Sequence, residues 1–298
     1  MDWLFFAILS PLLLAISNLV DKFVISKTIK HPMPYAMMYS FIQMFLGIFL
    51  LAFFKIQFVY PASFIAIAAG GIWTIASYTY VKSMMMEEAT KVMSLFFVAP
   101  IFTTFFAAIF LKEIFTPFKY VGIGLLVLSA ILISHKKISG RMRILPALKI
   151  ILLGVPLYSM ISILEKFSLT TLDYISLNFW IVGGAGSVAF LLLASDKIRL
   201  DFGTQFYVLK NKGFLKYTVI NEIIAFFAFM AGFIAISETY VSYVSGLGSI
   251  QPFFLFLFSL ILSLIFPHFI KERFNRQTLV VKLVSVLLII AGGWLIVS

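Results

Sequence analysis

The sequence predicts an all-α integral membrane protein with ten transmembrane helices in two inverted five-helix repeats. Three observations predict this fold class: the composition, the number of apolar segments of spanning length, and landmarks that recur in both halves of the chain. Of the 298 residues, 62% are hydrophobic and 12% are charged, whereas a soluble domain carries about 25% charged residues. No soluble protein of this size could bury so much apolar side chain, so the class is integral membrane protein.

Ten segments are long and apolar enough for a membrane-spanning helix, which needs about 20 mostly apolar residues. Their apolar residues run continuously rather than alternating, which favours helices over a β-barrel. The first segment lacks the basic stretch and the cleavage site of a removable signal, so we interpret it as the first membrane helix. The polar stretches 135–146 and 195–213 are of loop size. The ten predicted spans are 3–25, 34–54, 61–81, 91–111, 118–135, 147–169, 174–194, 215–237, 241–266 and 278–297.

Three landmarks recur in the same order in the two halves of the chain, as in an internal repeat. AISNLVDKF at 15–23 aligns with SMISILEKF at 159–167, an offset of 144 positions. The AP at 99–100 aligns with the QP at 251–252, an offset of 152, and FLKEIF at 110–115 aligns with FIKERF at 269–274, an offset of 159. The predicted repeats are residues 1–137 and 145–298. Because five helices are an odd number, the second repeat enters the membrane the opposite way up, as in many secondary transporters.

The 23 lysines and arginines are divided unequally between the two sides of the predicted membrane. Nineteen lie on the side of the first connection, and the other side holds only Lys55, Lys112, Lys119 and Lys166. The positive-inside rule assigns the basic side to the cytoplasm, so we expect a multi-pass plasma-membrane protein with both termini outside. The same distribution explains the net charge of +11 without a nucleic-acid partner.

The repeated motifs give the chain a family resemblance that covers nearly its whole length. With SNLVDK and SILEK in the first and sixth helices, Pro100 and Pro252 in the fourth and ninth, and LKE and IKE at the ends of those two, it resembles the drug/metabolite transporter superfamily. It is most similar to the ten-helix members built from two EamA-type repeats. The resemblance implies secondary transport of amino acids, nucleotide precursors, drugs or sugar derivatives through a central cavity.

Two features depart from this family pattern. Many relatives are expected to have cytoplasmic termini, whereas the charge count here places them outside. The interval from Pro252 to Glu272 is 20 positions, whereas the interval from Pro100 to Glu113 is 13. The ninth helix is therefore expected to be longer or broken, near Pro267.

An acid and a base stand side by side near the end of the first apolar segment. Asp21 and Lys22 are either an interfacial pair that reaches towards the headgroups or part of a cavity lining, because a charge at bilayer depth normally faces a protein cavity and a partner. Adjacent residues on a helix point about 100° apart, so the two cannot share a partner. Asn18 lies one turn before Lys22 on the same face. We expect Asn18 and Lys22 to line the cavity, Asp21 to contact another helix, and an anionic or zwitterionic substrate group to bind Lys22.

The same pattern recurs in the sixth predicted helix, where Ser162 lies one turn before Lys166 and Glu165 directly precedes Lys166. In inverted repeats the two copies lie towards opposite membrane faces. They are interpreted either as equivalent polar closures of an alternating-access device or as shared ancestry without a role for the second copy.

Other polar, aromatic and proline residues are weaker candidates for the transport path. Glu222 could carry a coupled proton, because burial disfavours the charged form of a carboxylate, or it could be an interfacial glutamate. Trp73 and Tyr78 could stack on a substrate or only pack. Four prolines could break helices and free backbone carbonyls near a site: Pro11, Pro100, Pro156 and Pro252. The lone amides Gln43, Asn178 and Gln251 are expected to form hydrogen bonds between helices. Glu113 and Glu272 are expected to be solvated or to anchor loops.

We expect a secondary transporter that moves a small polar or amphipathic metabolite by alternating access through a cavity between the repeats. The alternative is a flippase for a lipid-linked carrier. A membrane-embedded enzyme is disfavoured, because His31, His135 and His268 lack a metal-ligand spacing and the chain has no cysteine. The expected partners are the small-molecule substrate, the lipid bilayer and a coupling proton or ion as a further candidate, with no metal or cofactor.

Overall fold

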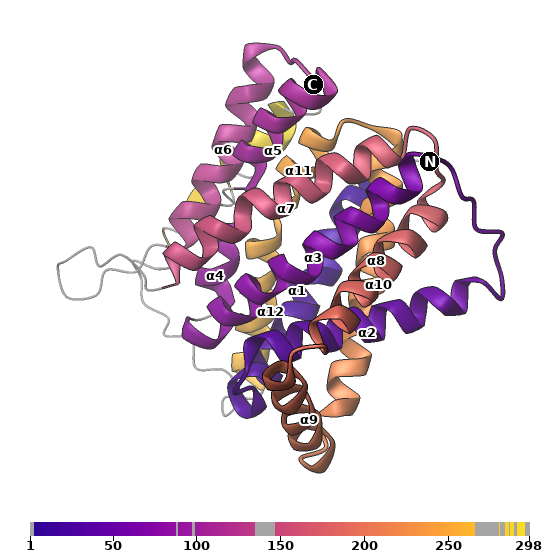
Figure 1. The fold of residues 1–298 in the computed structure, drawn as a ribbon. Helices are drawn as coiled ribbons and strands as arrows, with labels where there is room; N and C mark the ends of the chain where they lie inside the picture. The colour runs from indigo at the N-terminus through magenta and orange to yellow at the C-terminus, as the bar shows by residue number, and fades with distance from the viewer. Residues whose placement is uncertain are drawn as a thin grey trace.

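The computed structural model describes residues 3–87, 89–96, 99–134 and 147–265, with short pieces at 280, 284–285, 287–288 and 291–295. Within these residues every regular element is a helix, as Figure 1 shows. The predicted all-α class is therefore confirmed. The connection at 135–146, most of the predicted tenth span, and the residues His135, Pro267, His268 and Glu272 lie outside the described residues.

Seven segments of the described chain are long and apolar enough to cross a membrane. Two shorter apolar helical segments, Ala99–Leu111 and Pro117–Ser129, fall on the predicted fourth and fifth spans. The multi-pass membrane class is thus confirmed, while the count of ten spans stays a prediction. Six of the seven fall on α1 (Trp3–Thr28), α2 (Pro32–Leu50), α3 (Ala62–Met86), α7 (Leu148–Ser168), α8 (Tyr174–Leu192) and α10 (Leu215–Glu238), and the seventh is Val241–Leu262. The shorter segment Pro117–Ser129 lies in α6 (Pro117–Ser134).

The predicted ninth span, which was expected to be longer or broken, is divided into two helical segments. On the predicted fourth span the structure describes α4 (Ala89–Phe96) and α5 (Ala99–Phe106), which continues into the π-helix η1 (Ala107–Leu111). The ninth consists of α11 (Val241–Gly248) and α12 (Gln251–Ile265). Pro252 is the second residue of the later segment. A proline lacks a backbone N–H, so it is tolerated in the first turn of a helix but disrupts its interior.

A helix that the sequence did not predict occupies the polar stretch at 195–213. This helix, α9 (Asp196–Asn211), extends away from the bundle in Figure 1. The buried amide of Gln205 attaches it to the end of α1: its nitrogen donates to the Thr28 carbonyl at 3.1 Å, and its oxygen accepts from the Lys30 N–H at 3.1 Å. The loop interpretation was wrong because contacts with a distant part of the chain, rather than local apolarity, hold this helix in place.

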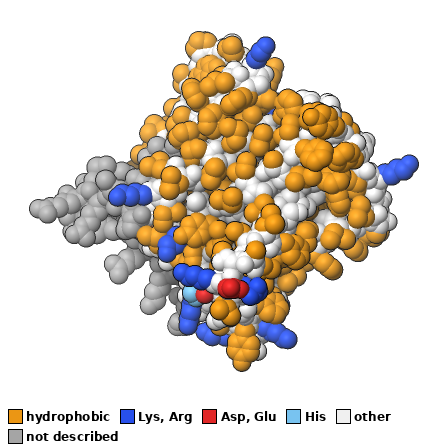
Figure 2. Space-filling view, in the orientation of Figure 1, with side chains coloured by type: hydrophobic (Ala, Val, Ile, Leu, Met, Phe, Trp, Pro, Cys, Tyr) orange, Lys and Arg blue, Asp and Glu red, His pale blue; other side chains and the backbone are white. Residues whose placement is uncertain are grey.

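Lysine and arginine side chains gather at the α9 end of the molecule, where Figure 2 shows them around one pale blue histidine and acidic neighbours. His31 Nδ1 lies 3.5 Å from Asp201 Oδ2 at this end. The rest of the face in view is largely apolar.

The first and third helices of each half run in the same direction. Lys22, near the end of α1, reaches the carbonyls at the end of α3. Lys166, near the end of α7, reaches the carbonyls at the end of α10. The carboxyl ends of α1 and α3 therefore lie together, and so do those of α7 and α10.

The two pairs run in opposite directions. Asp21, late in α1, contacts Asn221, early in α10, so α1 and α10 are antiparallel neighbours. In the same way Ser168, at the end of α7, donates to the Ala62 carbonyl at the start of α3 at 3.1 Å. It follows that α1 and α3 point one way through the bundle while α7 and α10 point the other way.

Candidate functional site

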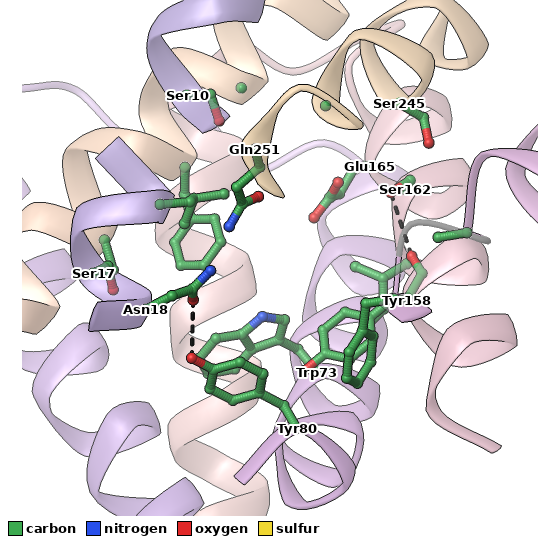
Figure 3. Close-up of a pocket in the computed structure, with 18 of the residues that line it drawn as sticks. Ser10, Ser17, Asn18, Trp73, Tyr80, Tyr158, Ser162, Glu165, Ser245 and Gln251 are labelled. Carbon is green, nitrogen blue, oxygen red and sulfur yellow. Dashed lines mark hydrogen bonds between the residues drawn. The ribbon is translucent and has the colours of Figure 1, made fainter. Parts of the chain in front are cut away.

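A cavity of about 340 Å³ lies between the two halves of the bundle. Figure 3 shows side chains from several helices converging on it. The first half contributes residues of α1, α3, α4 and α5, and the second half contributes residues of α7, α10, α11 and α12. Only Tyr39 comes from α2. This volume lies near the lower end of the range for small-molecule sites, about 300–1,000 Å³.

Asp21 is the most extensively hydrogen-bonded carboxylate of this pocket. Its Oδ1 accepts from the Tyr39 hydroxyl at 2.6 Å and from the Asn221 amide at 2.8 Å. Its Oδ2 accepts from the Tyr80 hydroxyl at 2.8 Å. The donors come from α2, α10 and α3, so this one side chain joins α1 to three other helices.

Asn18 lies one turn before Asp21 and shares a partner with it. The Tyr80 hydroxyl lies 2.9 Å from the Asn18 side-chain oxygen (Figure 3) as well as beside Asp21. A tyrosine has one hydroxyl hydrogen, so Tyr80 fully satisfies only one of these acceptors at a time. The amide nitrogen of Asn18 is buried and has no hydrogen-bond partner within the described chain.

Glu222 reaches the pocket from α10 and is 3% exposed. The Gln43 amide nitrogen donates both to its Oε2 at 2.8 Å and to its backbone carbonyl at 2.9 Å. Of the two positions considered from sequence, the structure places Glu222 in the interior rather than at an interface. Gln43 joins α2 to α10, which is the interhelical role expected for a lone amide.

Glu165, on α7, also lines the pocket and is 9% exposed. Unlike Asp21 and Glu222, its carboxylate has no hydrogen-bond or ion-pair partner among the residues described. Ser162 and Trp73 line the same pocket, and the Ser162 hydroxyl donates to the Tyr158 carbonyl at 3.3 Å. In Figure 3, Glu165 faces the space above Trp73 and Tyr158.

Neither lysine of the two acid–base dipeptides lines the pocket. The Lys22 ammonium donates to the Met84 and Glu87 carbonyls, both at 2.6 Å. The Lys166 ammonium donates to the Ile236 carbonyl at 2.8 Å and to the Thr239 carbonyl at 2.7 Å.

The expected orientation of the first dipeptide is therefore corrected: Asp21 lines the pocket and Lys22 contacts a neighbouring helix. The physical reason is that the last carbonyls of a helix lack intrahelical partners and carry partial negative charge. A lysine beside such an end satisfies them.

Glu113, which follows η1, satisfies the opposite kind of helix end. Its carboxylate accepts from the backbone N–H groups of Val241 and Ser242 at 3.3 and 3.4 Å and from the Ser242 hydroxyl at 2.9 Å. These are the first residues of α11, whose N–H groups have no intrahelical acceptor. Glu113 is buried, so it anchors this junction and is not a solvated residue.

The first half of the chain carries a recognisable family signature. Residues 1–135 match the EamA-like transporter family. This match confirms the EamA resemblance for that half of the chain and indicates a membrane-transport class. No curated protein matches the sequence. A solved structure titled only "Crystal structure of protein" is similar in fold, with a TM-score of 0.64 and 13% identity over 98% of this chain and 93% of that chain.

The EamA-like half also holds candidates that the structure places elsewhere. Tyr78 is absent from the pocket lining, and Tyr80, two positions later on α3, is present. Pro11 lies within the continuous helix α1, as Pro156 does in α7, so neither breaks its helix. No group of three or more His, Cys, Asp or Glu in the described chain is arranged to hold a metal ion.

Proposed function

We propose that the protein is a secondary transporter that moves a small polar or amphipathic metabolite by alternating access between two inverted five-helix repeats. The observation that carries the proposal is the make-up of the pocket. Its walls come from the first, third and fourth predicted helices of the first half and from their counterparts in the second half. A site between two such halves can open to one membrane face and then to the other as the halves rock.

The lysine contacts support the repeat independently of the sequence motifs. Lys22 reaches the carbonyls of residues 84 and 87, and Lys166 those of residues 236 and 239. Residue 236 lies 152 positions after residue 84, and residue 239 lies 152 positions after residue 87. This is the offset already found for the AP and QP landmarks. The antiparallel course of α1 and α7 supports the inversion.

Pocket-lining residues also fall at equivalent positions. At the offset of 144 they pair Asn18 with Ser162 and Asp21 with Glu165. At the offset of 152 they pair Trp73 with Ala225, Tyr80 with Gly232 and Ala99 with Gln251. The backbone framework is thus duplicated, whereas the chemistry of each position differs between the halves. That difference is what a site needs in order to bind an asymmetric molecule.

Contacts at helix ends lie at both ends of the bundle, where alternating access requires closures. Lys22 joins α1 to the end of α3 at one end of the bundle. Lys166 and Glu113 secure the junction between α10 and α11 at the other. In the proposed cycle the two lysine contacts, each within one half, persist, whereas the contact of Glu113 with α11 joins the two halves and forms and breaks. The basic α9 end faces the cytoplasm of a plasma membrane.

Cysteine labelling tests this cycle against a background of no native cysteine. Ser162→Cys places a thiol in the pocket, and alternating access makes it react with an impermeant maleimide applied from either membrane face. Thr204→Cys on α9 and Thr170→Cys after α7 are exposed controls at opposite ends. Thr204→Cys should react only from the cytoplasm and Thr170→Cys only from outside. Reaction of Ser162→Cys from one face alone, under every condition, would contradict the proposal.

A further inference from the structure

All the charged side chains that line the pocket are acidic. Asp21, Glu165 and Glu222 reach it from three helices, and no lysine, arginine or histidine is among the lining residues of the described chain. None of the three carboxylates forms an ion pair within that part of the chain. A carboxylate removed from water needs a compensating charge or donors. The pocket is therefore complementary to a cation rather than to an anion.

The nearest lysines in sequence do not supply that charge to the pocket. Lys22 and Lys166 direct their ammonium groups to backbone carbonyls at the ends of α3 and α10. The anionic substrate group expected from the sequence depended on Lys22 facing the cavity. Because that residue contacts a neighbouring helix, the charge argument reverses.

Glu165 is the carboxylate that is open to a ligand. Asp21 accepts three hydrogen bonds from protein donors, and Glu222 accepts one from Gln43. Glu165 is more than nine-tenths buried and accepts none from any described side chain. Its oxygens point into the pocket in Figure 3.

Asn18 is 5% exposed, and its unpartnered amide nitrogen is a second, independent polar group on the pocket wall. A buried amide without a partner is costly. It provides a donor for a hydroxyl or carbonyl oxygen of the same ligand. The pocket thus offers a ligand the Glu165 carboxylate as an acceptor and the Asn18 amide as a neutral donor.

Aromatic rings form much of the remaining wall. Trp73, Tyr80 and Tyr158 lie side by side below Glu165 in Figure 3. Trp73 packs against Phe229 with ring centroids 5.9 Å apart, and Phe96 packs against Tyr158 at 5.6 Å. Aromatic faces attract ammonium groups, and they also cover apolar bodies well.

We propose that the pocket binds a small organic ammonium compound, an amine carried on an apolar or aromatic body. Glu165 is its counter-ion, the aromatic wall surrounds its body, and Asn18 donates to a polar group on it. This inference names the substrate class of the transporter and therefore rests on the proposed function.

Three probes that differ in charge test the inference on the wild-type protein. They are 2-phenylethylammonium, neutral 2-phenylethanol and anionic 3-phenylpropionate, titrated calorimetrically against the purified full-length protein in detergent. A charged hydrogen-bonded contact implies that the ammonium binds about tenfold to a hundredfold more tightly than the alcohol. The anion should bind most weakly. Equal binding of the three probes, tighter binding of the anion, or no binding of the ammonium overturns the inference.

Two variants assign the counter-ion. Glu165→Gln should reduce the affinity for 2-phenylethylammonium by about tenfold or more while hardly changing that for 2-phenylethanol. Glu165→Asp keeps the charge and should retain most of the affinity. Asp196→Asn removes an exposed acid on α9, far from the pocket lining, and should bind like the wild type. Thermal unfolding checks that each variant is folded, and wild-type affinity in folded Glu165→Gln excludes Glu165 as the counter-ion.

The two proposals fail separately. Selective binding of the ammonium together with one-sided labelling of Ser162→Cys would leave a cation site in a protein that does not transport by alternating access. Labelling from both faces together with preference for the anion would leave a transporter whose substrate class is not an amine.

Discussion

Asp21 and Lys22 are neighbours in the sequence but act on different parts of the molecule. The carboxylate collects hydrogen bonds from three helices in the pocket, whereas the ammonium lies on the carboxyl end of α3. Because successive residues on a helix point about 100° apart, an acid–base dipeptide provides two independent contacts rather than an ion pair with itself. Glu165 and Lys166 divide in the same way.

The bond from Tyr39 to Asp21, at 2.6 Å, should contribute measurably to stability. Tyr39→Phe removes that donor without changing the ring, and a hydrogen bond to a charged group contributes about 1.5–3 kcal/mol. The variant should unfold at a lower temperature in detergent than the wild type. Tyr78→Phe is the matched control, since its hydroxyl makes no hydrogen bond within the described residues. Similar losses in the two variants would count against a special role for Asp21.

Polar residues within an apolar segment are the part of the site that a sequence can reveal. Asn18, Asp21, Ser162, Glu165 and Glu222 were all noticed for that reason, and all line the pocket. The side of the helix on which each would find its partner was not predictable. Asp21 is bonded to Asn221, 200 positions away, and no local pattern encodes that contact. The orientation of Lys22 was wrong for the same reason.

At the scale of the element, helix ends account for both lysine contacts. Lys22→Met preserves length and apolar packing but leaves the carbonyls of Met84 and Glu87 without this donor. We expect a loss of about 1–3 kcal/mol of stability and little change in which of the three probes binds best. Thermal unfolding and the calorimetric titration measure these separately, with the exposed Lys55→Met as control. An unchanged unfolding temperature combined with altered probe selectivity would indicate that Lys22 faces the pocket.

The contact between α3 and α8 is set by glycine. A Cβ built on Gly184 would collide with the Ile67 carbonyl, whereas one on the adjacent Gly183 would meet nothing within 4 Å. Gly184→Ala should therefore cost about 1–3 kcal/mol through overpacking. Gly183→Ala should be neutral or slightly stabilising, because alanine favours a helix by up to about 1 kcal/mol. Equal unfolding temperatures for the two variants would refute the close approach.

The divided ninth span and the polar helix α9 show what the length of apolar segments alone does not predict. The continuous apolar run at 241–266 conceals a turn at 249–250, after which Pro252 occupies the first turn of a new helix. The polar helix α9 has too little apolar sequence to be noticed, and Gln205 holds it against the end of α1. Both features depend on hydrogen-bonding groups rather than on hydropathy.

For the whole molecule, the contacts between Glu113 and α11 should act as one of the two closures. Cysteines at Glu113 and Ser242, joined by a short bis-methanethiosulfonate, would fix that end of the bundle shut. In this background Ser162→Cys should lose reactivity from that face and keep it from the other. Cleaving the linker with a reductant before labelling should restore both. Unchanged labelling from both faces in the cross-linked protein would show that this junction does not gate the pocket.

The fold class, the membrane location and the positions of the long helices were predictable from composition and periodicity, because the bilayer restricts a spanning chain to few solutions. The five-helix repeat stays a prediction from three short landmarks, which the opposed directions of α1 and α7 support. The shape of the pocket could not be predicted from the sequence. Its walls combine helices from both halves, and their spacing depends on packing across the whole bundle.

The lysines at the helix ends bind main-chain oxygens, and every amino acid carries the same main-chain oxygen. A salt bridge between side chains is lost when either partner mutates, so both partners must be retained together. Here only Lys22 and Lys166 are constrained by chemistry. Met84, Ile236 and Thr239 can change as far as packing allows without removing the acceptor. The sequences of the two halves can thus diverge, and the substrate of the transporter can change, while the lysine contacts at the helix ends persist.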